Sequence, residues 1–113
     1  MSPNIKNITN IMKALSNENR LKIIMWLMEP KAHFPKQVDG DLVKDGVCLG
    51  AFHVKLGISQ PTATNYLRIL ENADLVTSKR IKNWTFYKLN PDGMHLAEAL
   101  LKDIRESKAL LFT

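Results

Sequence analysis

Short polar side chains and one arginine lie close together in the middle of the chain. Thr64 and Arg68 are four residues apart, so in a helix they share one face with Asn65 between them. Amide and hydroxyl groups fit the donor and acceptor edges of nucleic-acid bases, and Asn65 is best suited to a bidentate contact with adenine. Gln60 extends this exposed polar face toward the start of the helix. The pattern indicates a surface that reads bases.

A group of cations follows in a segment rich in β-branched and aromatic residues. Double-stranded DNA carries one negative charge per about 1.7 Å of axis, so cations there can displace counterions from phosphates. The alternative is that they only keep an exposed strand soluble, and that Gln60 and Thr62 only solvate a helix start. The complete set of predicted DNA-binding residues is Gln60, Thr62, Thr64, Asn65, Arg68, Lys79, Arg80 and Lys82.

Metal ligands are sparse. One cysteine, Cys48, excludes an intrachain disulfide framework and any zinc site built on cysteine pairs. Without a second cysteine, a thiol switch would need an intermolecular disulfide or a mixed adduct, and a packed structural cysteine is the simpler interpretation. We therefore expect no metal and no cofactor. The weak candidates are His33, Cys48 and His53, with the loop acids Asp39, Asp41 and Asp45 nearby, and Asp92 with His95.

Composition and missing motifs exclude several functional classes. The sequence has no Gly-rich phosphate loop, nucleophile elbow or HExxH motif, so we expect no enzyme. With 45% hydrophobic and 24% charged residues, the 113-residue chain has the composition of one packed domain spanning 1–113. It has no apolar run long enough to cross a membrane and no secretory signal, which predicts a soluble cytoplasmic protein. The net charge of +5 favours an anionic partner only weakly.

The apolar periodicity predicts the elements that carry these residues. Steps of three and four indicate helices over 4–15, from about 16 to 29, and over 48–56. Gly57 is suited to cap the third helix, and Ser59 opens a fourth two residues later. A helix, a Gly-containing turn and a second helix are typical of a helix-turn-helix unit, whose second helix can enter the major groove of DNA.

A hairpin and a last helix complete the chain. Strands are predicted over 75–81 and 84–89, joined by Lys82 and Asn83, since Asn tolerates the left-handed backbone of a tight turn. The aromatic residues of the second strand are expected to pack in the hairpin and not to stack on bases. Residues 29–47 read as a long loop with a turn near residues 41–44, and such loops are more often functional than accidental. The fold class is mainly α with a small β-hairpin wing, in the order α-α-α-α-β-β-α.

Three stretches resemble the ArsR family of winged helix-turn-helix transcriptional repressors. ALSNENRLKIIMWL resembles the second-helix signature, GISQPTATNYLRILENADLV the turn and recognition helix, and TSKRIKNWTFYKLNP the wing, together covering residues 14–91. The resemblance implies a homodimeric repressor that binds an imperfect palindrome in double-stranded DNA. The chain departs from the metal-sensing members, since Gly50 stands where a second cysteine is expected and no second Asp and His pair follows Asp92 and His95. A signal of unknown identity, a small effector among the options, would release the DNA.

The first and last helices carry apolar stripes broader than one small core absorbs, which predicts a dimer interface. The alternative is that both helices pack only on their own domain. A second function class also stays open, a small basic helical module that binds a protein without sequence-specific DNA binding. The predicted interface residues are Ile5, Ile8, Ile11 and Met12, opposite Leu100, Leu101 and Ile104.

Overall fold

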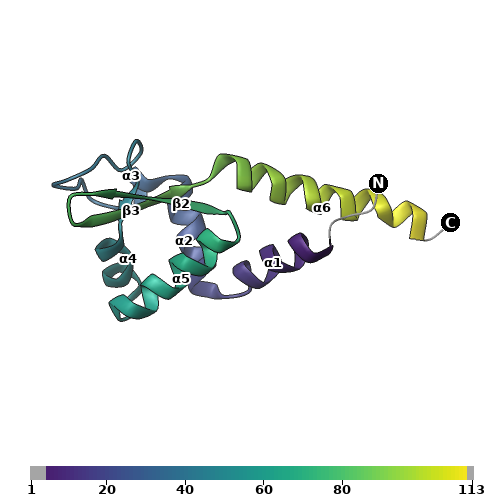
Figure 1. Ribbon diagram of the computed structural model, residues 1–113, viewed down its shortest axis with the longest axis horizontal. Helices are drawn as coiled ribbons and strands as arrows, with labels where there is room; N and C mark the ends of the chain where they lie inside the picture. The colour runs from purple at the N-terminus through teal and green to yellow at the C-terminus, as the bar shows by residue number, and fades with distance from the viewer. Residues whose placement is uncertain (1–4, 112–113) are drawn as a thin grey trace.

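The computed structural model describes the backbone of residues 5–111 and the side chains of residues 5–106. A small sheet packs along one side of a group of helices, while α1 (Ile5–Leu15) and α6 (Pro91–Leu111) extend away from it side by side (Figure 1). Within the described residues no helix is both long and apolar enough to span a membrane. The elements are α1 (Ile5–Leu15), α2 (Glu18–Met28), α3 (Pro30–His33), β1 (Val47–Cys48), α4 (Leu49–Leu56), α5 (Gln60–Asn72), β2 (Val76–Ile81), β3 (Trp84–Leu89) and α6 (Pro91–Leu111).

Local capping signals set the ends of the central helices. The Asn17 side chain accepts a hydrogen bond from the Arg20 N–H at 3.1 Å and starts α2. Gly57 ends α4 with a left-handed φ of 68°, and Ser59 then accepts the Thr62 N–H to start α5. The predicted helix-turn-helix is therefore confirmed, and the tight turn fixes how α5 leaves α4.

The sheet has one strand more than the predicted hairpin. β2 and β3 pair from Val76 opposite Leu89 to Ile81 opposite Trp84, and β1 adds to the other side of β3 in the order β1-β3-β2. A two-residue strand is too short to show any alternation, so β1 could not be predicted from the sequence. The predicted mainly α fold with a wing is confirmed, with a three-stranded antiparallel sheet in place of the hairpin.

The turn between β2 and β3 differs from the prediction in one respect. The left-handed residue is Lys82, with φ of 55°, whereas Asn83 keeps a negative φ. Two-residue hairpin loops can place their positive φ at the first loop position, which is set by the twist of the paired strands and not by the residue most tolerant of it. The prediction that Asn83 supplies this conformation was therefore wrong.

The segment predicted as a loop contains more local structure than expected. The short helix α3 occupies its start, where the sequence predicted only a loop. The predicted turn is present, since the Asp45 N–H donates to the Asp41 carbonyl at 2.9 Å. Residues 34–46, hereafter the wing loop, then lead from α3 to β1 beside the sheet (Figure 1).

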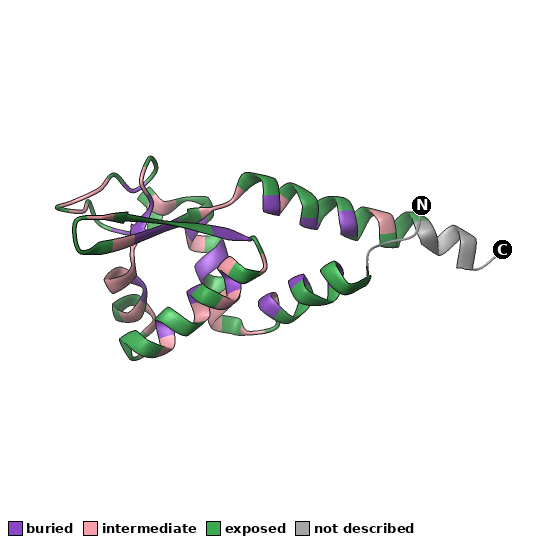
Figure 2. Cartoon of the chain, viewed as in Figure 1, coloured by how far each residue is buried: buried purple, intermediate pink, exposed green. Residues whose placement is uncertain are grey.

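The core lies between the sheet and helices α2, α4 and α5. Phe52 and Leu67 are fully buried, and a row of edge-to-face rings runs from Trp26 through Phe34 and Phe52 to Tyr87. As predicted, Phe86 and Tyr87 of the hairpin pack inward, but Trp84 remains 51% exposed. Buried positions also lie on the facing sides of α1 and α6 (Figure 2).

Candidate nucleic-acid interface

The exposed face of α5 gathers four of the predicted DNA-binding residues. Gln60, Thr64, Asn65 and Arg68 are all exposed, and together with Pro61 they line a shallow groove of about 330 Å³. The opposite face of the helix buries Ala63, Leu67 and Leu70 in the core. Amphipathic packing therefore holds the polar face outward, where a groove of DNA could reach it.

Three of these polar side chains are held by local hydrogen bonds. Arg68 Nη2 donates to Asn65 Oδ1, which keeps the amide and the guanidinium side by side. The Thr64 hydroxyl donates to the Gln60 carbonyl at 2.9 Å. The face therefore offers an oriented amide and guanidinium, both of which suit base edges.

Thr62 stands apart from the other members of the predicted set. It is half-buried, and its hydroxyl lies 2.9 Å from the Ser59 hydroxyl within the cap of α5. Its side chain therefore supports the helix start, which corresponds to the simpler interpretation considered for this residue.

The three predicted wing cations are in different situations. Lys79 Nζ lies 2.6 Å from Asp45 Oδ1, and Lys82 Nζ lies 3.0 Å from Asp39 Oδ1. Both acids belong to the wing loop. Arg80 is exposed and makes no hydrogen bond or ion pair within the described part of the chain. Arg80 is therefore the cation of this group that is free to meet a phosphate.

The sheet also orients Arg80 relative to α5. Ser78, two residues earlier on the same strand, donates from its hydroxyl to Glu71 Oε2 of α5 at 2.7 Å. Side chains two apart share one face of a strand, so Arg80 lies on the face of β2 that faces α5. Lys79 lies on the other face, toward the wing loop. Arg80 therefore lies on the same side of the sheet as α5, the helix that carries the polar face.

Hydrogen bonds and charges stabilise the ionised acids of the wing loop. The Asp41 N–H, with the Lys79 ammonium second, holds the pKa of Asp45 below its ordinary value of 3.8. Backbone N–H groups of Lys44 and Val43 likewise lower the pKa of Asp41. Asp45 is therefore anionic at neutral pH and can hold Lys79. This role of Asp39 and Asp45 could not be predicted from the sequence, because 43 and 34 residues separate them from their partners.

The weak metal candidates are not brought together. Within the described residues, no three His, Cys, Asp or Glu side chains form a group that could hold a metal ion. Cys48 is half-buried and precedes α4, where its N–H donates to Gln37 Oε1 at 2.7 Å. His33 and His95 are exposed, as is Asp92, and His53 is half-buried.

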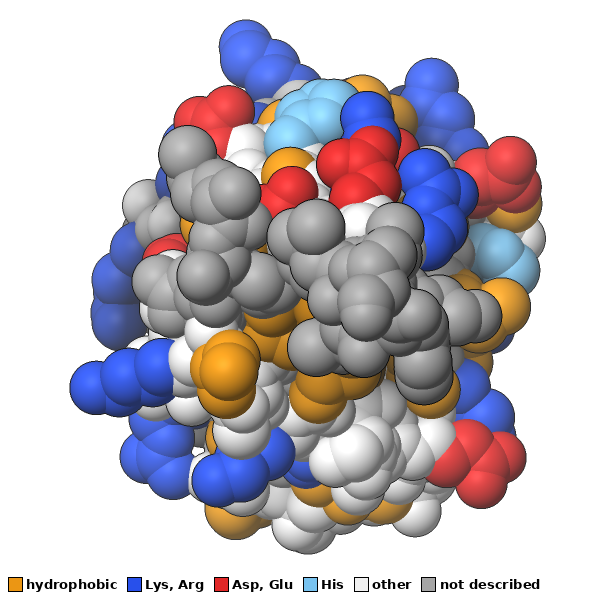
Figure 3. Space-filling view, turned by 90° about the vertical axis from the view of Figure 1, so that its right-hand side faces the viewer, with side chains coloured by type: hydrophobic (Ala, Val, Ile, Leu, Met, Phe, Trp, Pro, Cys, Tyr) orange, Lys and Arg blue, Asp and Glu red, His pale blue; other side chains and the backbone are white. Residues whose placement is uncertain are grey.

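The residues predicted for a dimer interface fall into two groups. Ile8, Ile11 and Leu100 are buried in the core cluster of their own chain. The other four remain exposed at the end of the molecule formed by α1 and α6, where hydrophobic side chains lie among lysines and arginines (Figure 3). Their exposed fractions are 75% for Ile5, 45% for Met12, 45% for Leu101 and 40% for Ile104.

A helix-turn-helix followed by a β-hairpin wing defines a winged helix-turn-helix protein. The chain is 41% identical over 95 residues to the uncharacterized HTH-type transcriptional regulator YbzH of Bacillus subtilis, a match that spans 83% of this chain and 95% of that protein. It therefore belongs to the HTH-type transcriptional regulators. No protein-family model matches the sequence.

Solved structures show the same fold. One is an ArsR family transcriptional regulator, with a TM-score of 0.70, 13% identity and 94% of both chains covered. Another is the homodimeric winged helix-turn-helix DNA-binding domain Mb0332 from Mycobacterium bovis, with a TM-score of 0.62 and 20% identity, covering 93% of this chain and 83% of that one. The fold is thus the one that the ArsR resemblance implies.

Proposed function

We propose that the protein is a homodimeric transcriptional repressor that binds an imperfect palindrome in double-stranded DNA. The observation that carries this proposal is the exposed polar face of α5, with Asn65 and Arg68 paired on it and Arg80 on the adjacent strand. Each α5 would enter one major groove and read bases, while the wing would contact the flanking phosphates. Occupying a promoter would block transcription.

The dimer would form through α1 and α6. Four large apolar side chains stay exposed there although their neighbours Ile8, Ile11 and Leu100 are buried, and exposed apolar patches mark interaction surfaces. A two-fold axis at this end would place two copies of α5 on one face of the duplex. That symmetry supports a palindromic operator.

The regulator would work without catalysis and without a cofactor. Its B. subtilis relative is a transcriptional regulator, and binding DNA requires only the surface described above. Because this relative is a bacterial transcriptional regulator and bacterial DNA lies in the cytoplasm, we propose a cytoplasmic location for the protein. An effector would bind at a site separate from the DNA-binding surface. Because binding at the two sites is coupled, the bound effector would lower the affinity for DNA.

Fluorescence anisotropy tests the proposal with the DNA upstream of the protein's own gene and a scrambled duplex, each at low and physiological salt. We expect about a thousandfold preference for the upstream DNA that persists as salt rises. Weak binding to both duplexes that vanishes with salt would contradict the proposal. That result would mean that the basic charge acts only electrostatically, as in a small protein-interaction module.

A further inference from the structure

A mainly apolar cavity of about 450 Å³ lies between the wing loop and the face of the sheet that is turned away from α5. Trp84 and Phe86 of β3 line it, and both lie on the same face of the strand. Cys48 of β1 pairs with Phe86 and extends this face. The wing loop supplies residues 34–39, and Ala51 of α4 completes the lining.

Two polar side chains of this lining are already engaged by the protein. Gln37 Nε2 donates to the Gly46 carbonyl at 3.0 Å, and Gln37 Oε1 accepts the Cys48 N–H at 2.7 Å. Asp39 Oδ1 accepts the ammonium group of Lys82 at 3.0 Å. A ligand would have to break one of these bonds to gain a polar contact with Gln37 or Asp39, which favours an apolar ligand.

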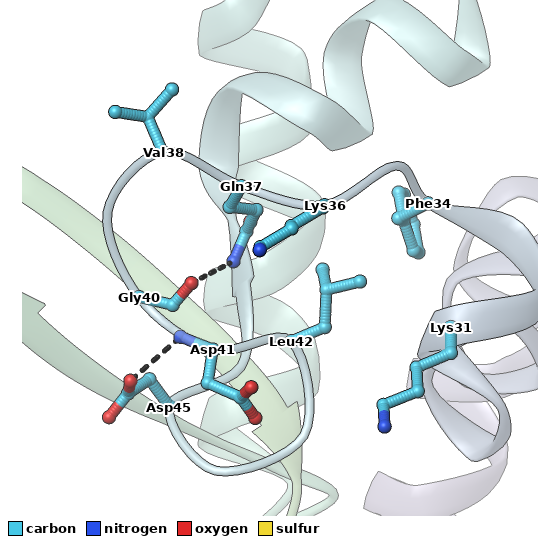
Figure 4. Close-up of a pocket in the computed structure, with 9 residues that line it drawn as sticks. All are labelled: Lys31, Phe34, Lys36, Gln37, Val38, Gly40, Asp41, Leu42 and Asp45. Carbon is cyan, nitrogen blue, oxygen red and sulfur yellow. Dashed lines mark hydrogen bonds between the residues drawn. The ribbon is translucent and has the colours of Figure 1, made fainter.

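Two large apolar side chains remain exposed at the same cavity. Val38 is fully exposed, and Trp84 is 51% exposed although Phe86, two residues later on the same face, is only 1% exposed. Figure 4, which draws the neighbouring cavity inside the wing loop, shows Val38 directed away from the loop and the ammonium group of Lys36 directed into it. The charge of Lys36 thus points toward the other cavity, while the indole and the isopropyl group are available to a ligand.

We infer that this cavity binds an uncharged aromatic small molecule. Its volume is in the range of small-molecule sites, which are mainly apolar and carry few polar groups. An aromatic ring would stack on the indole of Trp84 and contact Val38 of the wing loop. Removing these apolar surfaces from water drives the binding, whereas a charged group would lose its hydration without gaining a partner.

The regulatory consequence rests on the proposed function. A bound molecule would join Val38 of the wing loop to Trp84 of the wing. It would thereby stabilise the arrangement in which Asp39, next to Val38, holds Lys82. Since Lys82 is predicted to meet a phosphate, a ligand that favours the paired arrangement would lower the affinity for DNA.

Fluorescence titration of the DNA-free protein tests the site with N-phenyl-1-naphthylamine, an uncharged probe that becomes brighter in apolar surroundings. We expect saturable binding of one probe per chain. Val38→Asn should weaken this binding at least about fivefold, which corresponds to about 1 kcal/mol. The matched control is Val43→Asn, which should bind as the wild type does, because Val43 is 54% exposed in the same loop but is not among the lining residues.

Nuclear magnetic resonance locates the probe independently. The chain has two tryptophans, whose indole N–H signals are assigned by loss of one signal in Trp84→Phe. The probe should shift the Trp84 signal more than the Trp26 signal. Its sulfonated analogue, 8-anilino-1-naphthalenesulfonate, should leave the Trp84 signal in place at the same concentration, because the anion is excluded from the cavity.

Three results would overturn the site: no saturable binding, equal affinities in Val38→Asn and Val43→Asn, or a larger shift at Trp26 than at Trp84. Equal affinities would place the probe elsewhere, such as on the exposed side chains of α1 and α6. An equal shift of Trp84 by the sulfonate would overturn the uncharged class of ligand. Both valines are exposed, so the variants should fold, and circular dichroism checks this.

The regulatory consequence is measured separately. Saturating probe should raise the Kd for the upstream DNA about threefold, and should not do so in Val38→Asn. An unchanged Kd would overturn the regulatory consequence while the site stands. Probe binding by a protein without sequence preference for DNA would overturn the proposed function alone.

Discussion

The ammonium group of Lys79 lies 2.6 Å from the carboxylate of Asp45, 34 residues earlier in the chain. Lys82 is held in the same way by Asp39 at 3.0 Å. Two of the three wing cations predicted to contact DNA are therefore paired with acids of the wing loop. A phosphate would have to compete with these acids, which makes the wing loop a determinant of DNA affinity.

Releasing Lys79 should strengthen DNA binding. Asp45→Asn keeps an oxygen that can accept the Asp41 N–H but removes the charge that holds Lys79. We expect affinity for all duplexes to rise about two- to fivefold, and the slope of log K against log salt to steepen by about one. Anisotropy titrations measure both. Asp103→Asn on α6 makes the same charge change far from the wing and is the control, and a gain of the same size in both variants would rule out release of Lys79.

Substitutions on α5 and on the wing should have different effects on DNA binding, because α5 is proposed to read bases and the wing to contact phosphates. Asn65→Ala should relax the preference at one base pair per half-site, at a cost of about 1–3 kcal/mol in discrimination, because a bidentate contact is lost. Arg80→Ala should weaken binding to all sequences alike and flatten the salt slope by about one. Lys82→Ala should act in the same direction as Arg80→Ala but less strongly, since Asp39 already holds Lys82.

Binding to a library of single-base operator variants checks this division of roles. If Asn65→Ala and Arg80→Ala changed the preference and the salt slope in the same way, the assignment of bases to α5 and phosphates to the wing would be wrong.

A charge on the exposed stripe of α6 should disrupt the dimer. Leu101 is 45% exposed, and Leu101→Lys would place an ammonium group in the proposed interface. We expect light scattering to show twice the mass of one chain for the wild type and the mass of one chain for this variant at micromolar concentration. Leu21→Lys is the matched control, because Leu21 is 44% exposed but lies on α2. A monomeric wild type would refute the dimer.

Gly93 should not tolerate a side chain. A Cβ at this position would lie 1.5 Å from the Asp74 carbonyl oxygen, a backbone atom that cannot move without shifting the turn after α5. We expect Gly93→Ala to lower the free energy of unfolding by about 1–3 kcal/mol or more, measured by urea denaturation. Gly50→Ala serves as the control, since it meets nothing within 4 Å on α4 and should be neutral or stabilising. Equal stability of the two variants would show that the contact relaxes freely.

Acid should weaken the contact between wing loop and wing. The folded pKa of Asp45 is depressed below 3.8, so its contribution to stability is present above that value and disappears as pH falls through the folded pKa. The Tm of the wild type should therefore approach that of Asp45→Asn as pH falls from 7 to below 3.8. Thermal scans by circular dichroism measure the difference, and a constant gap between the two proteins would contradict the prediction.

Much of the helix-turn-helix formed by α4 and α5 could be predicted from the sequence, because the capping and periodicity signals that specify it are local. Gly57 and Ser59 specify the end of α4 and the start of α5 within a few residues, and the spacing of Ala63, Leu67 and Leu70 leaves the polar face outward. The hairpin strands were predicted with nearly their observed bounds. The short strand β1 was not, because two residues carry no periodicity and its pairing depends on β3.

Local signals in the amino-acid sequence specify the helix-turn-helix, the wing and the polar face of α5, since capping and amphipathic periodicity act between residues at most a few positions apart. Which charges remain available depends instead on tertiary contacts. Tertiary packing paired Lys79 and Lys82 with acids 34 and 43 residues away and left Arg80 free. It also buried Ile8 and Leu100 while leaving Leu101 exposed. Such outcomes depend on the path of the whole chain, because contacts between distant residues form only where packing brings their elements together.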